Sequence, residues 1–130
     1  MKTEEEIIDD VKRYLEGSVL ANEISGIITD LDRPKNSKNE DVIVKLLSCD
    51  FGQIQQAYLN VNIYVPDIEK DGQMVKNKPR LRKLERLSAD ILERHHGGYF
   101  YFSTESQHVE DVDNINCHMI NNRVLYKFNN

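Results

Sequence analysis

Acidic residues gather on both sides of a polar loop in the first third of the chain, and their side chains could hold a metal ion. Asp30 and Asp32 begin the loop, Glu40 and Asp41 follow it, and Lys45 comes shortly afterwards. Carboxylates beside a lysine could bind Mg²⁺ in a nuclease. Known nuclease cores of this kind have an acid two positions before the lysine, where this chain has isoleucine. The missing acid argues against a nuclease, and we expect the chain not to be an enzyme. A small metal-dependent nuclease stays open as an alternative.

The four histidines are the other candidates for catalysis or metal binding. His95 and His96 are adjacent, so on one helix they would point about 100° apart and could not easily share an ion. Near a helix C-terminus they would instead complement the helix dipole. His108 and His118 lie on strands expected to be neighbours, but no acid is placed by the sequence to orient either ring. Because no glycine-rich phosphate loop, nucleophile elbow or paired-cysteine motif occurs either, we expect no metal and no cofactor.

The most regular pattern in the chain is an alternation through residues 57–66. In an extended chain, one side would carry only apolar residues and the other tyrosines and asparagines. The apolar set is Ala57, Leu59, Val61, Ile63 and Val65, and the polar-aromatic set is Tyr58, Asn60, Asn62 and Tyr64. The pattern predicts a strand with one face in the core. Its second face has rings and amides but no acid, base or nucleophile, which suits contact with a partner rather than catalysis.

Two amphipathic helices are expected to support this strand. Thr3 and Glu6 have the spacing of a capping box, and apolar residues then recur on one helical face, which predicts a helix over residues 4–16. A second helix is expected to begin near Pro79, and its apolar stripe stops at Gly97-Gly98.

Five strands complete the prediction, over residues 24–29, 42–47, 57–66, 99–109 and 119–128. The second and third strands are joined by the turn residues Asp50-Phe51-Gly52, which favours an antiparallel hairpin. Residues 67–78 form a polar excursion with Asp71-Gly72 at its tip, where a projecting β-arm could lie. In the last strand the apolar residues change phase near Asn121-Asn122, which predicts a bulge or a tight turn. The expected fold is a single α+β domain over residues 1–130, with two helices packed on an antiparallel sheet in the order α-β-β-β-α-β-β.

Composition limits the classes of protein to which the chain can belong. Its 130 residues suffice for one hydrophobic core, and 39% of them are hydrophobic. The formal net charge of −5 disfavours nonspecific DNA binding by a broadly basic surface. No apolar run is long enough for a membrane span, and the first residues lack the order of a secretory signal. Cys49 and Cys117 have no partner at zinc or redox spacing, so we expect reduced thiols in an intracellular protein.

Three segments, in this order of helices and strands, resemble a known family. They are Arg33-Pro34-Lys35-Asn36-Ser37, Glu40-Asp41-Val42-Ile43-Val44 and Leu59-Asn60-Val61-Asn62-Ile63-Tyr64-Val65-Pro66. In these segments the chain is similar to the tail terminator, or tail-completion, proteins of tailed bacteriophages and prophages. The resemblance covers nearly the whole chain as element order, and as sequence it depends on these short stretches.

The resemblance implies a small α+β protein that forms a ring, usually hexameric, on the last ring of the tail tube and presents the surface that meets the head connector. It implies no enzyme activity and no cofactor, with the tube protein and the connector protein as partners. DNA would be only cargo through the pore, and an acidic lumen would repel its phosphates. The protein would be cytoplasmic during assembly and then part of the virion.

Another head-tail joining or neck protein of the same fold is the nearest alternative. A ring of this kind stops tube growth by surface complementarity alone, so the residues to identify are contact residues. The candidate interface residues are Arg33, Tyr58, Asn60, Asn62, Tyr64 and Arg80. For the four strand residues, packing against a helix of the same subunit is the alternative role. For Arg80, on the charged side of the second helix, the alternative is a merely solvated helix face.

Overall fold

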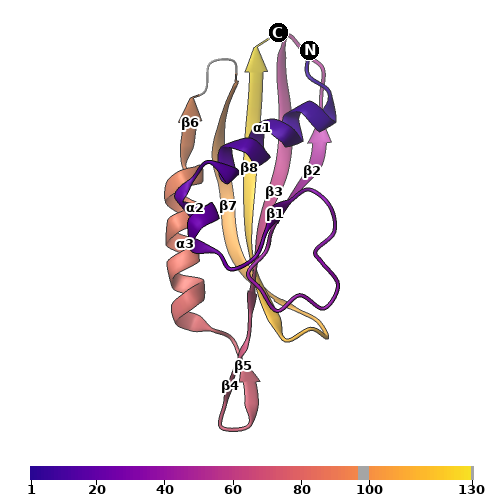
Figure 1. Cartoon of the computed structure of the whole chain (residues 1–130). Coiled ribbons are helices and arrows are strands. Elements are labelled where there is room, and N and C mark those ends of the chain that lie inside the picture. The colour runs from indigo at the N-terminus through magenta and orange to yellow at the C-terminus, as the bar shows by residue number, and fades with distance from the viewer. Residues whose placement is uncertain (97–99, 130) are drawn as a thin grey trace.

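The computed structural model describes residues 1–96 and 100–129 (Figure 1). In this part of the chain, three helices accompany a six-stranded sheet of order β1-β2-β3-β8-β7-β6. The helices are α1 (Glu4–Glu16), α2 (Val19–Glu23) and α3 (Lys78–Leu92). The strands are β1 (Ile28–Thr29), β2 (Val42–Cys49), β3 (Ile54–Pro66), β4 (Ile68–Lys70), β5 (Gln73–Val75), β6 (Arg94–His96), β7 (Phe100–Val112) and β8 (Cys117–Asn129). The predicted α+β class with a mostly antiparallel sheet is confirmed.

Helix starts follow the local capping residues. The Thr3 hydroxyl accepts a hydrogen bond from the Glu6 backbone N–H (3.3 Å), and the Glu6 carboxylate accepts one from the Thr3 N–H (3.0 Å). This reciprocal pair is the predicted capping box, and the predicted helix over residues 4–16 is confirmed. At α3 the Asn77 side chain accepts from the Arg80 N–H (3.3 Å), with Pro79 in the first turn.

The centre of the sheet is a pair of long strands that run antiparallel along their whole lengths. Ile54 of β3 lies opposite Asn129 of β8, and Pro66 lies opposite Cys117. On its other side β3 pairs with β2, as expected from the turn between them. The predicted hairpin is therefore confirmed.

Both long helices lie on one face of this sheet. Figure 1 shows α1 crossing the strands and α3 running along them beside β7. The side chains between helices and sheet are fully buried, including Leu59 and Val61 of β3, Leu84 of α3 and Tyr126 of β8. Burial of this apolar layer supplies most of the driving force for folding.

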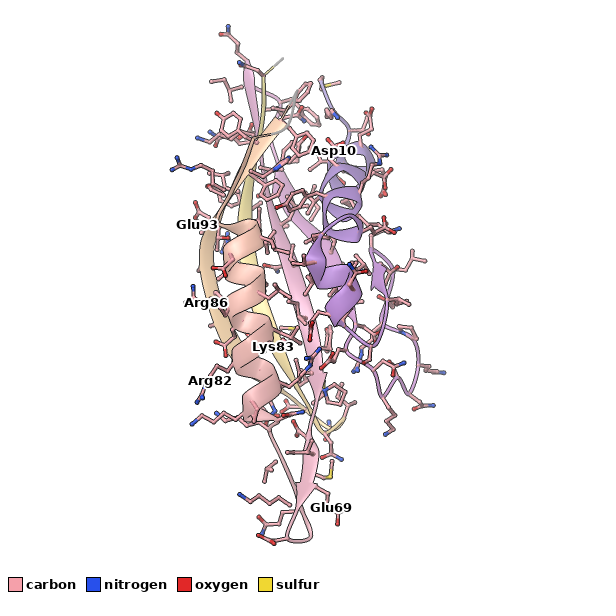
Figure 2. All side chains as sticks on the ribbon, turned by 60° about the vertical axis from the view of Figure 1, so that its left-hand side comes forward. Asp10, Glu69, Arg82, Lys83, Arg86 and Glu93 are labelled. Carbon is pink, nitrogen blue, oxygen red and sulfur yellow. The ribbon has the colours of Figure 1, made fainter. Side chains whose placement is uncertain are left out.

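Residues 68–75 form a two-stranded arm, β4–β5, that extends from the end of β3. Asp71 and Gly72 at its tip have φ angles of 52° and 80°, the left-handed region that an Asp-Gly hairpin turn requires. Figure 1 shows the arm at the end of the molecule opposite both termini, and Figure 2 labels Glu69 near its tip. The projecting β-arm that the sequence allowed at residues 67–78 is present.

The end of the second helix was wrongly predicted. Helix α3 ends at Leu92, and β6 begins two residues later. The ring of His95 lies among aromatic rings, with centroids 4.4 Å from Tyr14 and 5.1 Å from Phe102. Pairing of β6 with β7 and this ring packing replace another helical turn, so His95 does not complement a helix dipole. The expected stop at Gly97-Gly98 and the expected strand start at residue 99 fall outside the described residues.

The predicted number of elements also needs correction. Within the described residues the main sheet has six strands rather than five, and a third helix, α2, is present. Ser18 caps α2 by accepting from the Leu20 N–H (3.3 Å), and Ile24 ends it, so the expected strand over residues 24–29 shrinks to Ile28–Thr29. A local cap thus overrides the β-branched composition of that segment.

The interruption expected near Asn121-Asn122 does not occur, because β8 keeps one register with β3 from end to end. Asn122 occupies a core-facing position between Ile120 and Val124 and is fully buried. Its amide donates to the Ser88 hydroxyl (3.3 Å) and to the Val61 carbonyl (3.4 Å). The apparent change of phase is therefore one buried polar residue in a regular strand. The register irregularities of the described sheet lie elsewhere, between Leu46 and Ser48 of β2 and between Thr104 and Ser106 of β7.

None of the helices in the described residues is both long enough and apolar enough to cross a membrane.

Candidate interaction surface

The second face of the sheet is turned away from α1 and α3, and we call it the open face. Directly opposed residues of antiparallel strands point to the same side, so the register identifies its members across four strands. Its members include Ile43, Lys45 and Ser48 of β2; Gln56, Tyr58, Asn60, Asn62 and Tyr64 of β3; Met119, Asn121, Arg123, Leu125 and Lys127 of β8; and Tyr101, Ser103, Ser106, His108 and Glu110 of β7. The four strand residues predicted at an interface all lie here, and each is half-buried. The alternative, that they pack under a helix of the same chain, is wrong because α1 and α3 cover the other face.

Three tyrosine rings of the open face lie beneath cationic groups. The Arg123 guanidinium carbon is 5.2 Å from the ring centre of Tyr58, and the Lys127 Nζ is 5.9 Å from that of Tyr101. At the end of the face near the arm, Arg33 is 4.8 Å from the ring centre of Tyr64. Such cation–π contacts hold the long basic side chains flat against the sheet. The result is a surface of rings, guanidinium and ammonium groups, and amides.

The two asparagines lie between the tyrosines, and the side chain of Asn62 links β3 to β8. The Asn121 amide donates to the Asn62 side-chain oxygen over 2.7 Å. Asn60 lies opposite Arg123 on one side and Lys45 on the other. Amide groups at these positions can exchange their hydrogen bonds for bonds to a docked partner, since they both donate and accept.

Arg33 is placed by the loop that folds over one end of the open face. Its Nε donates to Asp41 Oδ2 (2.9 Å) and its Nη2 to the Asn39 carbonyl (2.7 Å). The Ser37 hydroxyl and the Ile27 N–H also donate to Asp41 (2.6 and 3.1 Å). Burial alone would raise the pKa of Asp41, but these hydrogen bonds and the Arg33 charge outweigh it and lower the pKa below its usual value.

Tyr64 beneath this loop is also desolvated, and burial raises the pKa of its phenol. Arg33 is therefore both a clamp within the loop and a cover for one tyrosine of the open face.

Arg80, the other predicted interface arginine, is used inside the chain. Its guanidinium donates to the Glu40 carboxylate, to the Glu23 carboxylate (2.7 Å) and to the Glu23 carbonyl (2.6 Å). The hydrogen bonds to Glu40, and to a smaller extent those to Glu23, raise the pKa of Arg80 above its usual value. The residue ties the start of α3 to α2 and to the residues before β2. Figure 2 shows Arg82 and Arg86 on the outer side of α3 instead, where both are exposed.

The acidic loop cluster does not form the arrangement expected for a nuclease. The Asp41 carboxylate is 1% exposed and accepts the three hydrogen bonds described above. Asp30 lies 3.5 Å from Lys12, and the fully exposed Asp32 lies 3.6 Å from Lys45. Among the described residues, no three His, Cys, Asp or Glu side chains are grouped to hold a metal ion.

The histidines of β7 and β8 do not meet across the sheet. His108 lies opposite Asn121 and is paired with Glu110 (2.5 Å). His118 lies three positions before Asn121 in β8, opposite Asp111, and its Nδ1 is 2.7 Å from Asp67. Each ring therefore has an acidic partner of its own.

A hollow of about 360 Å³ lies between the Arg33 loop and the turn that joins β7 to β8. Lys35 and Lys38 line one side and Asn114 and Asn116 the other. Both asparagines have positive φ angles, 68° and 50°, as tight polar turns often require. The hollow is half open and polar, and it adjoins the Arg33 end of the open face.

Reasoning from the sequence missed the basic residues that complete the surface. Arg123 and Lys127 alternate with Leu125 on β8, and this pattern was available in the sequence. It could be used only with the knowledge that β8, rather than another strand, lies beside the tyrosine face of β3. The buried polar residues Asp10, Gln55 and Asn122 were also missed, because their partners lie far away in the chain.

No protein-family model matches this chain, and no curated protein sequence matches it.

Proposed function

We propose that the protein is a phage or prophage tail terminator, which caps the tail tube as a homo-oligomeric ring and joins it to the head connector. The observation that carries the proposal is the open face. It is four strands wide, it is rich in tyrosine, arginine and asparagine, and no helix of the described chain covers it. Tyrosine and arginine are enriched in protein interfaces, and a surface of this composition is suited to docking.

Two further features agree with an assembly role. The β4–β5 arm extends beyond the body of the protein and exposes Ile68 and Met74, which are 43% and 47% accessible. A two-stranded hairpin has little stability of its own in water, so a partner that packs on it would hold it in place. The net charge of −5 opposes retention of DNA, which a tail channel must let pass.

The mechanism proposed is steric. A ring that matches the end of the tube on one side, and lacks the outgrowth surface of the tube protein on the other, stops further addition. Complementary surfaces suffice for this action, and no side chain has to change its covalent state.

The experiment is deletion of the gene from its phage or prophage, with electron microscopy of the assembled particles. We expect tubes of uncontrolled length that carry no heads, and restoration of normal tails by the wild-type gene. Tubes of normal length that fail to join heads would instead identify a head-tail joining or neck protein. Normal, infectious particles without the gene product would overturn both assignments.

A direct assay tests the nuclease alternative. Purified protein is incubated with linear DNA and Mg²⁺ or Mn²⁺, and Asp32→Asn with Lys45→Ala serves as the matched inactive variant. Cleavage that the variant loses would overturn the terminator proposal. We expect no cleavage by either protein.

A further inference from the structure

The acidic residues of this chain are concentrated in its first 32 residues. Residues 1–32 hold nine of the 22 acidic residues and three of the 17 basic ones, a net charge of −6. The remaining 98 residues hold 13 acidic and 14 basic residues, a net charge of +1. The acidic segment contains α1, which packs on the covered face of the sheet, while basic residues lie on the open face.

The outer side of α1 carries a regular acidic stripe. Glu5, Asp9, Lys12 and Glu16 are spaced by four, three and four residues, so they follow one line along the helix, opposite the buried Ile7 and Val11. Lys12 is paired with Asp30 at 3.5 Å. The three acids are exposed, and among residues 1–96 and 100–129 none of them has a cation within 4.0 Å.

The open face carries the opposite charge. Arg123 and Lys127 of β8 lie on it, and Arg94 of β6 lies opposite Ser103 at its edge. Throughout the described part of the chain, these three cations have no carboxylate within 4.0 Å. Glu110 is the one carboxylate that the strand register places on the face, and His108 is its partner. Arg123, Lys127 and Arg94 are therefore left for a partner to neutralise.

The two sets of charges have similar spacing. Asp9 and Glu16 are seven residues apart on a helix, or about 10 Å at 1.5 Å per residue. Arg123 and Lys127 are four residues apart on a strand, or about 13 Å. Arginine, lysine and glutamate side chains are long enough to accommodate the difference.

We propose that copies of this chain associate head to tail, with the outer stripe of α1 in one copy packed on the Arg123 and Lys127 region of the open face in the next. Because the two surfaces differ and lie on opposite sides of the protein, the contact is heterologous. Repetition of such a contact closes into a ring when the rotation between copies allows it. This inference deepens the proposed function and rests on it for the ring.

The size of the open face suits such a contact. Its longest strands have 13 residues. With a rise of about 3.3 Å and a strand spacing of about 4.8 Å, four strands cover roughly 40 Å by 15 Å. Each partner in a typical stable interface contributes about 800 Å², so the face has the required scale.

A second copy fits the face better than single-stranded nucleic acid does. Bases bind to such sheets by stacking on exposed aromatic rings, whereas Arg123 already covers Tyr58 and Arg33 already covers Tyr64. The acidic net charge would also repel phosphates. The carboxylates of α1 in a second copy, by contrast, need no exposed ring. They need only to accept hydrogen bonds from the outward N–H groups of the same cations.

The test is an exchange of charge between the two surfaces. One variant carries Asp9→Lys and Glu16→Lys, a second carries Arg123→Glu and Lys127→Glu, and a third carries all four changes. Self-association is measured by sedimentation velocity over a concentration series at low salt, where charge contacts are least screened. The wild-type chain is expected to associate, and each two-residue variant about tenfold more weakly or worse.

The decisive arms restore the complementarity. An equimolar mixture of the two variants is expected to assemble, because each reversed surface then meets its complement, and the third variant is expected to assemble alone. A matched control, Glu93→Lys with Arg82→Glu, reverses one acid and one base at α3 (Figure 2) and is expected to associate like the wild type. Circular dichroism of each variant verifies that it is folded.

Several results would overturn the inference. They are a wild-type chain that stays monomeric throughout the series, two-residue variants that associate like the wild type, a mixture that fails to assemble, and a control that is weakened equally. Loss of single-stranded DNA binding in the second variant alone, with self-association unchanged, would assign the face to nucleic acid. Association through other surfaces would leave the proposed function intact, since that is judged by tube length and head attachment in the deletion strain.

Discussion

The two faces of the sheet are built from the same strands and have opposite physical character. The covered face has Leu59, Val61 and Val124 at full burial, with its polar groups paired inside the protein. On the open face, Tyr58, Asn60 and Leu125 are only partly buried, and Arg123 is exposed. The covered face therefore accounts for stability, and the open face is the surface that we propose for recognition. Substitutions of the same kind on the two sides separate these roles.

The largest difference is expected between two leucines. Leu59→Ala on the covered face should lower the free energy of unfolding by about 3 kcal/mol, because it removes buried methyl groups and leaves a cavity. Leu125→Ala on the open face should cost about 1 kcal/mol or less, because its side chain is already partly in water. Urea denaturation of both variants measures the two values. Equal losses would mean that the open face is part of the core.

Two arginines should differ next. Arg80→Ala removes the partner of the nearly buried Glu40 and of Glu23 and should cost about 2 kcal/mol, less than for a fully buried pair because Arg80 is partly exposed. Arg123→Ala should change stability by about 0.5 kcal/mol, since it loses a single exposed cation–π contact. Chemical denaturation at fixed pH compares them. A smaller loss for Arg80→Ala than for Arg123→Ala would contradict the role of Arg80 as an internal clamp.

A smaller difference is expected between two tyrosines. The Tyr126 hydroxyl donates to Asp10 Oδ2 over 2.7 Å within the core, so Tyr126→Phe should cost about 1 kcal/mol. Tyr64→Phe should be close to neutral, because its contact with Arg33 involves the ring, which phenylalanine keeps. Thermal unfolding followed by circular dichroism gives both shifts. A larger shift for Tyr64→Phe would reveal a hydrogen bond of its hydroxyl that is important for stability.

The smallest expected effect is a pH dependence of folding stability that comes from Asp41, at the Arg33 end of the open face. The pKa of Asp41 is lowered in the folded protein, so its ionised form stabilises the fold above the pKa of an unfolded aspartate, about 3.9. This contribution is lost as the pH falls through the lowered folded pKa. Stability of the wild type should therefore decline below about pH 4 more steeply than that of Asp41→Asn.

Urea denaturation of the wild type and of Asp41→Asn between neutral pH and acid, with near-ultraviolet circular dichroism of the tyrosines, checks this expectation. Asp9→Asn, which alters an exposed carboxylate, is the matched control and should keep the slope of the wild type. Parallel slopes for the wild type and Asp41→Asn would show that Asp41 does not hold the Arg33 loop.

Local patterns in the sequence were enough to predict several elements. The capping box at Thr3, the alternation through residues 57–66 and the Asp71-Gly72 turn each depend on neighbours a few positions away. For that reason α1, the central strand and the arm were predicted correctly. The four strand residues of the candidate surface were identified for the same reason.

Tertiary contacts decided the features that the sequence left open or that were predicted wrongly. Asn122 is a core residue because Ser88 and Val61 satisfy its amide, and α3 ends at Leu92 because β6 pairs with β7. Arg80 turns inward because Glu23 and Glu40 converge on it. The sequence by itself determined α1, the start of α3, the long strands and which strand has a polar-aromatic side, because these follow from short-range periodicity. Only the tertiary structure decided that this side stays uncovered and gathers cations from β8, because that depends on which distant segments the sheet brings together.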